Sequence, residues 1–351
     1  MIAATERRSV SHAGRLVHVD APRGRFSHRQ IAELPELLAP SDLLVVNDAA
    51  TLPASLRVQN LDAELRLVGH GETPESFHAV LFGPGDFHTD TDLRPEAPVV
   101  RVNDVLSFGP RLQARVEHVD ARSQRLITLR FQSTGAELWS ELYRLGRPIQ
   151  YRHVERPLEL WDVQNTFAAR PFAFEVPSAG LPLDHVLLAR LKGRGVRLAT
   201  LTHAAGISAT GSAELDARLP LPERYEIPAA TREAIDETRR SGGSVIAVGT
   251  SVVRALESNW LEHGTLREGG GLARLRLGPG YRRVVVDGLF TGIHTHGTSH
   301  FDLLEAFAPR ALLDRVERDC ERQGYLTHEF GDSCLIRAEP AQTARSEPRA
   351  A

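Results

Sequence analysis

Three histidines near the C-terminus stand at a spacing that can hold a ligand or a metal ion. His294, His296 and His300 form the pattern His-x-His-x-x-x-His, and His203 would be a fourth ligand. Imidazole titrates near neutral pH, so His203 and His294 are candidates for proton transfer. Imidazole also binds zinc, but this spacing matches no compact zinc motif, and the chain has 15 histidines in all. The pattern favours a polar ligand-binding loop over a metal site.

A second candidate is a strand, turn and helix in the middle of the chain. The apolar run 245–248 is typical of a buried strand, Gly249 and Thr250 turn the chain, and a helix carrying Arg254 follows. Free backbone N–H groups at such a turn bind anions and polar ligands. An ordinary strand-to-helix connection is an equally good interpretation of this stretch alone.

Polar or small residues also occupy other loops at the ends of predicted strands. In an open α/β sheet, ligands bind outside the carboxyl ends of the strands. We therefore expect five loops to meet in one crevice: Asn47-Asp48, 177–180, 203–208, 249–251 and 294–300. Asn47 and Asp48 would serve equally well to cap and turn the chain.

Strand and helix patterns alternate through most of the chain. We expect strands at 15–20, 42–48, 196–201, 245–248 and 281–290, and helices at 27–38, 183–194, 228–241, 252–261, 301–308 and 309–323. This alternation predicts an α/β fold with a mostly parallel sheet.

Between residues 58 and 147 the pattern changes to short alternating segments. They lie at 64–68, 78–82, 99–102, 111–119 and 126–131, are separated by turn residues, and are followed by a helix at 135–145. Such segments predict a small β-barrel or sandwich. We assign 1–57 and 148–338 to an α/β substrate-binding domain, 58–147 to an inserted β-barrel domain, and 339–351 to a disordered tail.

Composition excludes several classes of protein. The 351 residues suffice for two domains, and 42% hydrophobic with 25% charged residues is ordinary for a soluble protein. No apolar run approaches the roughly 18 residues that span a membrane, and we see no signal peptide. Two cysteines, Cys320 and Cys334, fit a reducing cytoplasm. A net charge of −3 is not typical of a protein whose main task is to bind nucleic acid. P-loop and Gly-x-Ser-x-Gly patterns are absent.

Read in order, these loops and strand ends resemble the S-adenosylmethionine:tRNA ribosyltransferase-isomerase family of queuosine synthesis. The matching pieces are Gly24 with His28, 42–48 with Pro53-Ala54, Glu64, Gln164 with Phe167, 177–181, Thr202-His203, 225–228, 248–250 with Arg254 and 256–258, Asp287 with Leu289, Thr291 and His294, and Tyr325 with Gly331-Asp332.

The resemblance implies an α/β domain that carries an inserted β-barrel, and a transferase and isomerase reaction. The ribosyl part of S-adenosylmethionine moves onto 7-aminomethyl-7-deazaguanine at the tRNA wobble position and rearranges to an epoxy-cyclopentanediol. Adenine and methionine are released, and the product is epoxyqueuosine-tRNA. S-adenosylmethionine is thus a consumed substrate, and we expect no cofactor and no metal. We expect a cytoplasmic monomer with S-adenosylmethionine and tRNA as its partners.

Such a reaction needs a base near the sulfonium-activated C5′ atom and a hydrogen-bond donor to the departing adenine. On the matching positions, the resemblance implies His203 and His294 as the catalytic residues. It implies these substrate contacts: Asn47, Asp48, Ser178, Gly180, Gly249, Thr250, Arg254 and Asp332.

Several family patterns are changed in these loops. Asn-Asp-Thr-Arg is Asn-Asp-Ala-Ala at 47–50, His-x-Gly-x-Gly-Thr-Phe is His-Ala-Ala-Gly-Ile-Ser-Ala at 203–209, and the acidic residue of the family's His294 loop is lost at 292–298. Because these loops differ from the family pattern while the surrounding residues match it, three alternatives to the family reaction stay open. These are an enzyme that consumes S-adenosylmethionine with a non-tRNA acceptor, an inactive relative that keeps the nucleoside pocket, and a metal-dependent hydrolase built on the His294 cluster.

Overall fold

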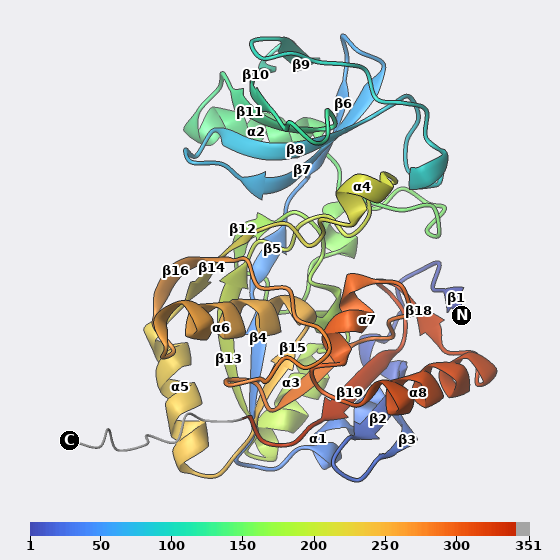
Figure 1. Cartoon of the computed structure of the whole chain (residues 1–351), viewed down its shortest axis with the longest axis vertical. Coiled ribbons are helices and arrows are strands. Elements are labelled where there is room, and N and C mark those ends of the chain that lie inside the picture. The colour runs from blue at the N-terminus through green and yellow to red at the C-terminus, as the bar shows by residue number, and fades with distance from the viewer. Residues whose placement is uncertain (342–351) are drawn as a thin grey trace.

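The computed structural model describes residues 1–341, in which a nine-stranded sheet flanked by helices lies next to a six-stranded antiparallel sheet (Figure 1). The strands of the large sheet lie in the order β16 (Gly269–Ala273), β14 (Glu223–Ile227), β13 (Arg197–His203), β4 (Leu43–Asn47), β15 (Val245–Val248), β17 (Gly288–Gly292), β19 (Ser333–Arg337), β2 (Arg15–Asp20) and β3 (Arg25–Gln30). None of the helices within this range is long and apolar enough to cross a lipid bilayer.

The predicted mostly parallel sheet is wrong in part, because the large sheet is mixed. The pairs β13–β4, β4–β15, β15–β17 and β19–β2 are parallel, whereas the other four neighbouring pairs are antiparallel. The parallel centre follows from the helices that connect its strands. The antiparallel strands lie toward both edges of the sheet, where β14 with β16 and β2 with β3 are neighbours.

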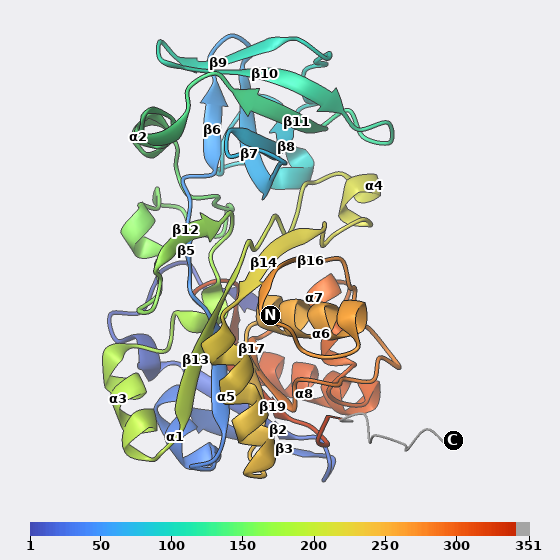
Figure 2. The same ribbon diagram turned by 90° about the vertical axis from the view of Figure 1, so that its left-hand side faces the viewer.

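Strand β4 lies at the centre of this sheet and is apolar from Leu43 to Val46, with the polar Asn47 at its end. Its five residues are all buried, and its side chains alternate between two cores. Leu43 and Val45 pack into the core that holds helices α5 (Ala229–Arg240), α6 (Thr250–His263), α7 (Ser299–Leu304) and α8 (Arg310–Arg322). Leu44 and Val46 pack into the core that holds α1 (Leu34–Leu37) and α3 (His185–Gly193). Helices therefore cover both faces (Figure 2).

The six-stranded sheet curls into a nearly closed barrel. Its order is β6 (Ser55–Val58), β7 (Ala63–His70), β8 (Ser76–Phe82), β11 (Leu126–Phe131), β10 (Leu112–Val119) and β9 (Val105–Gly109), with α2 (Gly135–Leu145) packed against it. The two edge strands meet where the Gln59 N–H donates to the Ser107 carbonyl at 2.7 Å. The Asn60 side chain adds hydrogen bonds to the backbone of Val105 and Ser107.

Smaller elements join the two sheets. β5 (Ala49–Thr51) pairs in parallel with β12 (Arg170–Ala173) between them (Figure 2). Elsewhere, β1 (Ile2–Ala3) pairs with β18 (Leu326–Thr327) near the N-terminus (Figure 1). The remaining short elements are α4 (Ala213–Asp216) and the 3-10 turns η1 (Ser11–Ala13), η2 (Ile31–Glu33), η3 (Thr91–Leu93), η4 (Leu160–Asp162) and η5 (Ser178–Gly180).

Three predicted elements are wrong, and the contacts of the structure explain two of them. The helix at 27–38 is strand β3, a 3-10 turn and one turn of helix, because β3 pairs with β2 along its length. The segment 99–102 is not a strand. The strand at 281–290 begins only at Gly288, because the Glu257 carboxylate accepts the N–H groups of residues 284–286.

The predicted tail begins at residue 339. The Glu339 carbonyl accepts a hydrogen bond from Arg283, and the Ala341 N–H donates to the Asp287 carboxylate. Residues 342–351 of the predicted tail lie outside the described part of the chain.

Candidate functional site

Asn47 ends strand β4 and clamps it to the end of β13. Its side-chain nitrogen donates to the His203 carbonyl at 3.0 Å, and its side-chain oxygen accepts the N–H groups of His203 and Ala49. The neighbouring Asp48 carboxylate accepts a hydrogen bond from the Thr202 hydroxyl at 2.7 Å. These contacts bring the two predicted loops together. They occupy the buried Asn47 amide with backbone groups, whereas Asp48 is only partly buried.

His203 lies at the centre of this junction, fully buried, with the carboxylate of Glu223 beside it. The His203 Nε2 atom is 3.4 Å from Glu223 Oε2 but lacks hydrogen-bond geometry, and within residues 1–341 neither ring nitrogen has a hydrogen-bond partner. Burial, followed by the charge of Arg254, holds the pKa of His203 well below its usual range. The imidazole is therefore neutral at neutral pH, in the form that accepts a proton.

Arg254 projects from α6 to the same carboxylate. Its guanidinium forms an ion pair with Glu223 and donates to the carbonyls of Leu221, Ala273 and Leu275. Glu223 also accepts the Gly206 N–H at 2.6 Å, which ties the loop after β13 to β14. Burial lowers the pKa of Arg254 to about 10, so it stays charged. The structure places Arg254 as a support for Glu223, with its donors committed to protein acceptors.

The turn at Gly249 faces the turn at 178–180, as the crevice hypothesis expects. A Cβ atom on Gly249 would lie 3.4 Å from the Ala179 Cβ, and Gly249 has a φ of +94°. Gly180 packs still more tightly, because a Cβ there would meet the Phe167 ring at 2.6 Å. Beside it, the Asn165 side-chain amide is buried without a hydrogen-bond partner in the described part of the chain. Ser178 and Thr250 are half-buried and begin η5 and α6.

His294 and His300 stack on one another in the loop after β17. Their ring centroids are 5.0 Å apart, and the Thr291 hydroxyl is 2.8 Å from His294 Nε2. Burial lowers the pKa of both imidazoles, to about 4 for His300, on which the charge of Arg254 also acts. His296 instead turns toward Asp314 and Glu317. Within residues 1–341 these three histidines do not form a metal-ligand set.

Asp332 holds the loop between β18 and β19. Its buried carboxylate forms ion pairs with Arg8 and Arg15 and accepts the N–H groups of Arg15 and Leu326. Both oxygen atoms of this predicted substrate contact are therefore already used by the protein. Two surface hollows lie elsewhere: one of about 190 Å³ lies beside β3 and Tyr325, and one of about 590 Å³ is lined by residues 4–13 with Leu326 and Phe330. No predicted site residue lines either of these two hollows.

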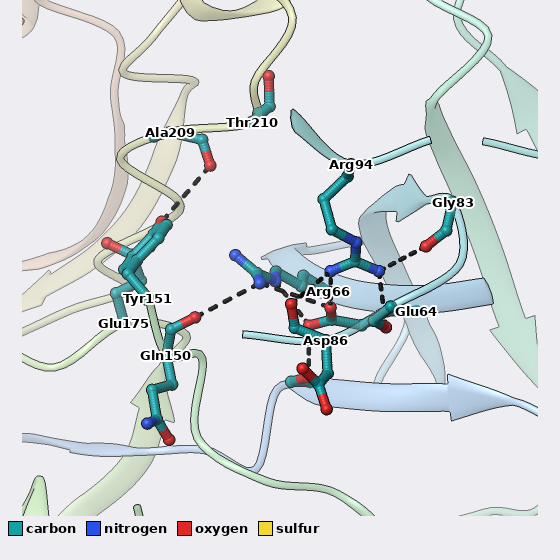
Figure 3. A network of polar contacts seen from close by, with 12 residues as sticks. Glu64, Arg66, Gly83, Asp86, Arg94, Gln150, Tyr151, Glu175, Ala209 and Thr210 are labelled. Atoms are coloured by element: carbon teal, nitrogen blue, oxygen red, sulfur yellow. Dashed lines mark hydrogen bonds and ion pairs between the residues drawn. The ribbon is translucent and has the colours of Figure 1, made fainter. Parts of the chain in front are cut away.

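Sequence reasoning missed a polar cluster between the barrel and the large sheet (Figure 3). The Glu175 carboxylate accepts hydrogen bonds from the Tyr151 hydroxyl and from the side chain and N–H of Ser208. Burial raises the pKa of Glu175 to about 7, and the charge of Glu329 adds to the rise. A carboxyl poised near neutral pH is a candidate for acid–base work. The cluster lies next to the His203 loop, because Ser208 belongs to that loop.

The barrel supplies a buried cation to this cluster. Arg66 points from β7 toward Tyr151, donates to Glu64 at 2.7 Å, and leaves its Nη1 atom without a partner within residues 1–341 (Figure 3). Arg94 binds the other oxygen of Glu64 at 2.6 Å. Arg66 alternates with Leu65 and Leu67 of the barrel core and so faces out of the barrel, where an arginine that becomes buried must be paired. The residues that Arg66 approaches could not be predicted, because Tyr151 and Glu175 are distant from it in the sequence.

The comparisons with known proteins match nearly the whole chain. A family model described as "Queuosine biosynthesis protein" matches residues 2–336. The S-adenosylmethionine:tRNA ribosyltransferase-isomerase of Anaeromyxobacter sp. (strain K) is 33% identical over 334 residues, 92% of each chain. That of Thermosynechococcus vestitus is 36% identical over 312 residues, covering 87% of this chain and 84% of its own.

A solved structure supports the fold. The crystal structure of S-adenosylmethionine tRNA ribosyltransferase from Thermotoga maritima has a TM-score of 0.51 and 23% identity, and the match covers 95% of this chain and 96% of that one. The family model and the two relatives show that the chain belongs to the queuosine biosynthesis protein family.

Proposed function

We propose that this chain transfers the ribosyl moiety of S-adenosylmethionine to 7-aminomethyl-7-deazaguanine in tRNA and isomerises it, giving epoxyqueuosine with release of adenine and methionine. The observation that carries the proposal is the match over 92% of the chain to relatives named for this reaction. S-adenosylmethionine is the consumed substrate, and the protein needs no cofactor. The proposed enzyme is a cytoplasmic monomer.

His203 and His294 are the proposed proton-transfer groups. Both imidazoles are neutral at neutral pH because burial lowers their pKa values. A buried imidazole without a partner in residues 1–341 calls for one, since buried polar atoms in native proteins are almost always hydrogen-bonded. Bound substrate is that partner in this proposal. His203 would take the proton next to the sulfonium, with Glu223 beside it to stabilise the imidazolium that forms.

The predicted substrate contacts divide into two groups. Asp48, Ser178 and Thr250 are partly buried side chains at the strand ends, and they are the proposed direct contacts, with the backbone of Gly180 and Gly249. Asn47, Arg254 and Asp332 are bound to protein groups, and they support the site indirectly. The carboxyl of Glu175 joins the proposed site from the barrel side.

The proposed domain division follows the two sheets except at residues 55–57, which are part of strand β6 of the six-stranded sheet. Residues 1–57 and 148–338 form the α/β substrate-binding domain, and 58–147 form the inserted barrel. The link through β5 and β12 supports this division. It would place the polar cluster of Arg66, Tyr151 and Glu175 at the junction of the two domains.

The test is the product on tRNA. Purified protein is incubated with S-adenosylmethionine and tRNA that carries 7-aminomethyl-7-deazaguanine, and the tRNA nucleosides are then analysed by mass spectrometry. Formation of epoxyqueuosine supports the proposal.

The changed loop at 47–50 favours an alternative in which the acceptor is not tRNA. There Ala49 and Ala50 stand in β5 where the family has a polar pair. Release of adenine with no epoxyqueuosine formed on the tRNA would favour that alternative.

A further inference from the structure

We propose that His153, His328 and Glu329 form a binding site for a divalent first-row transition metal ion, for which Zn²⁺ is the probe. Each residue offers one donor atom, and the three atoms lie within 4.8 Å of one another. Two imidazoles and one carboxylate are the protein ligands of an open, catalytic-type zinc site. Within residues 1–341 no other group of histidine, cysteine and carboxylate side chains converges in this way.

The side chains are already close to a coordinating arrangement. His153 Nε2 lies 2.5 Å from Glu329 Oε2, and the rings of His153 and His328 stack with centroids 4.3 Å apart. Neighbouring ligand atoms on a tetrahedral zinc ion lie about 3.3 Å apart, given Zn–N distances of 2.0–2.1 Å. Small side-chain rotations would therefore bring all three donors onto one ion.

The backbone holds His328 in an uncommon conformation. Its φ is +67°, and Asn103 is the only other residue in the described part of the chain, glycine apart, with a positive φ. Such conformations persist where the surrounding structure fixes them, often at functional sites. Here the Gly331 N–H donates to the His328 carbonyl at 3.0 Å and closes the turn.

Both segments that supply the ligands are anchored independently of any ion. The loop of His328 and Glu329 is fixed through Asp332, which binds Arg8 and Arg15. The segment of His153 is fixed two residues earlier, where the Tyr151 hydroxyl binds Glu175. A prearranged set of donors avoids much of the ordering cost of metal binding. An ion there would also clamp residues far apart in the sequence to one another.

This site goes beyond the proposed function and differs from the His294 cluster that the sequence suggested. It also departs from the sequence-based expectation that no metal is bound. All titrations below contain neither S-adenosylmethionine nor tRNA. Their failure would leave the proposed function standing, and a failure of the proposed function would leave the metal site standing.

The experiment is titration of chelator-treated, full-length protein with Zn²⁺ by calorimetry, and with Co²⁺ by visible absorption. We expect one equivalent of bound metal. His328→Asn removes the imidazole while suiting the left-handed backbone, and Glu329→Gln removes the carboxylate charge. Each should weaken binding by at least about 100-fold, since even outer-shell partners of a ligand contribute 10- to 100-fold.

The matched control is His118→Asn, an exposed histidine on β10, which should bind metal as the wild type does. Less than a tenth of an equivalent on the wild type would overturn the proposal, as would unchanged binding in both ligand variants. Thermal melts of the metal-free variants report whether they fold. If neither variant folds, the test rests on the wild type, which should bind one equivalent of Zn²⁺ and show Co²⁺ d–d absorption bands. Co²⁺ absorption without such bands would overturn the proposed site.

Discussion

The Nε2 atom of His203 lies 3.4 Å from the Oε2 atom of Glu223, with both side chains buried at the ends of neighbouring strands. The same carboxylate holds the guanidinium of Arg254. Glu223 therefore places a negative charge beside His203, the predicted base. Arg254, which the sequence predicted to bind substrate, instead pairs with Glu223 and holds it in place. This arrangement also lets the effects of the three side chains be separated by substitution.

His203→Ala should lower turnover more than substrate binding. Loss of a general base costs about 10²- to 10⁴-fold in rate, and we expect kcat to fall by at least about 100-fold with a small change in KM. Steady-state kinetics of adenine release measures both constants. His118→Ala, on the barrel surface, is the control that should match the wild type. A raised KM with unchanged kcat would assign His203 to binding alone.

Arg254→Ala should destabilise the fold as well as weaken activity. Removing one partner of a buried ion pair leaves an uncompensated charge, here on Glu223, at a cost of about 3 kcal/mol. Urea unfolding measures the loss. Arg147→Ala removes an exposed ion pair with Glu159 and should cost under about 1 kcal/mol. Equal losses in the two variants would show that Arg254 is not the support described here.

Glu175 should make stability depend on pH. Its folded pKa, raised to about 7, lies above the value of an unfolded glutamate, so the folded state binds the proton more tightly. The contribution is favourable below the unfolded pKa of about 4.5 and is lost as pH rises to about 7. Glu175→Gln should therefore lose about 2–3 kcal/mol less stability than the wild type between pH 5 and pH 8. Parallel stability curves for the two proteins would contradict the raised pKa.

Gly180→Ala should disturb the crevice. A methyl group would lie 2.6 Å from the Phe167 ring, and overpacking of this kind costs about 1–3 kcal/mol. We expect a lower melting temperature and a raised KM for S-adenosylmethionine. Gly193→Ala is the matched control, because a methyl group there meets nothing within 4 Å at the end of α3. A Gly180 variant as stable and active as that control would show that the turn has room.

The sequence predicted most of the apolar strands and helices because their patterns are local. Val245–Val248 and Gly135–Leu145 were predicted with the bounds that the structure has. Segment 27–38 was misjudged because its strand pairs with a partner earlier in the chain, a contact that outweighs helical spacing. Segment 281–287 was misjudged because a single distant carboxylate, that of Glu257, takes up its N–H groups.

The site was predictable only where the loops themselves carry the chemistry. His203, Gly249 and His294 lie in the loops that strand order alone would place together. The cluster of Arg66, Tyr151 and Glu175 depends on the packing of the barrel against the large sheet, which no local pattern encodes. The commitment of Arg254 and Asp332 to protein partners likewise follows from contacts with distant residues.

The most direct measurement of the central claim is adenine release from S-adenosylmethionine by the purified protein, with and without tRNA that carries 7-aminomethyl-7-deazaguanine. The family reaction predicts release that requires the modified tRNA and stops when His203 is replaced. Release at the same rate without tRNA, or no release under either condition, would contradict the assignment of tRNA as the acceptor.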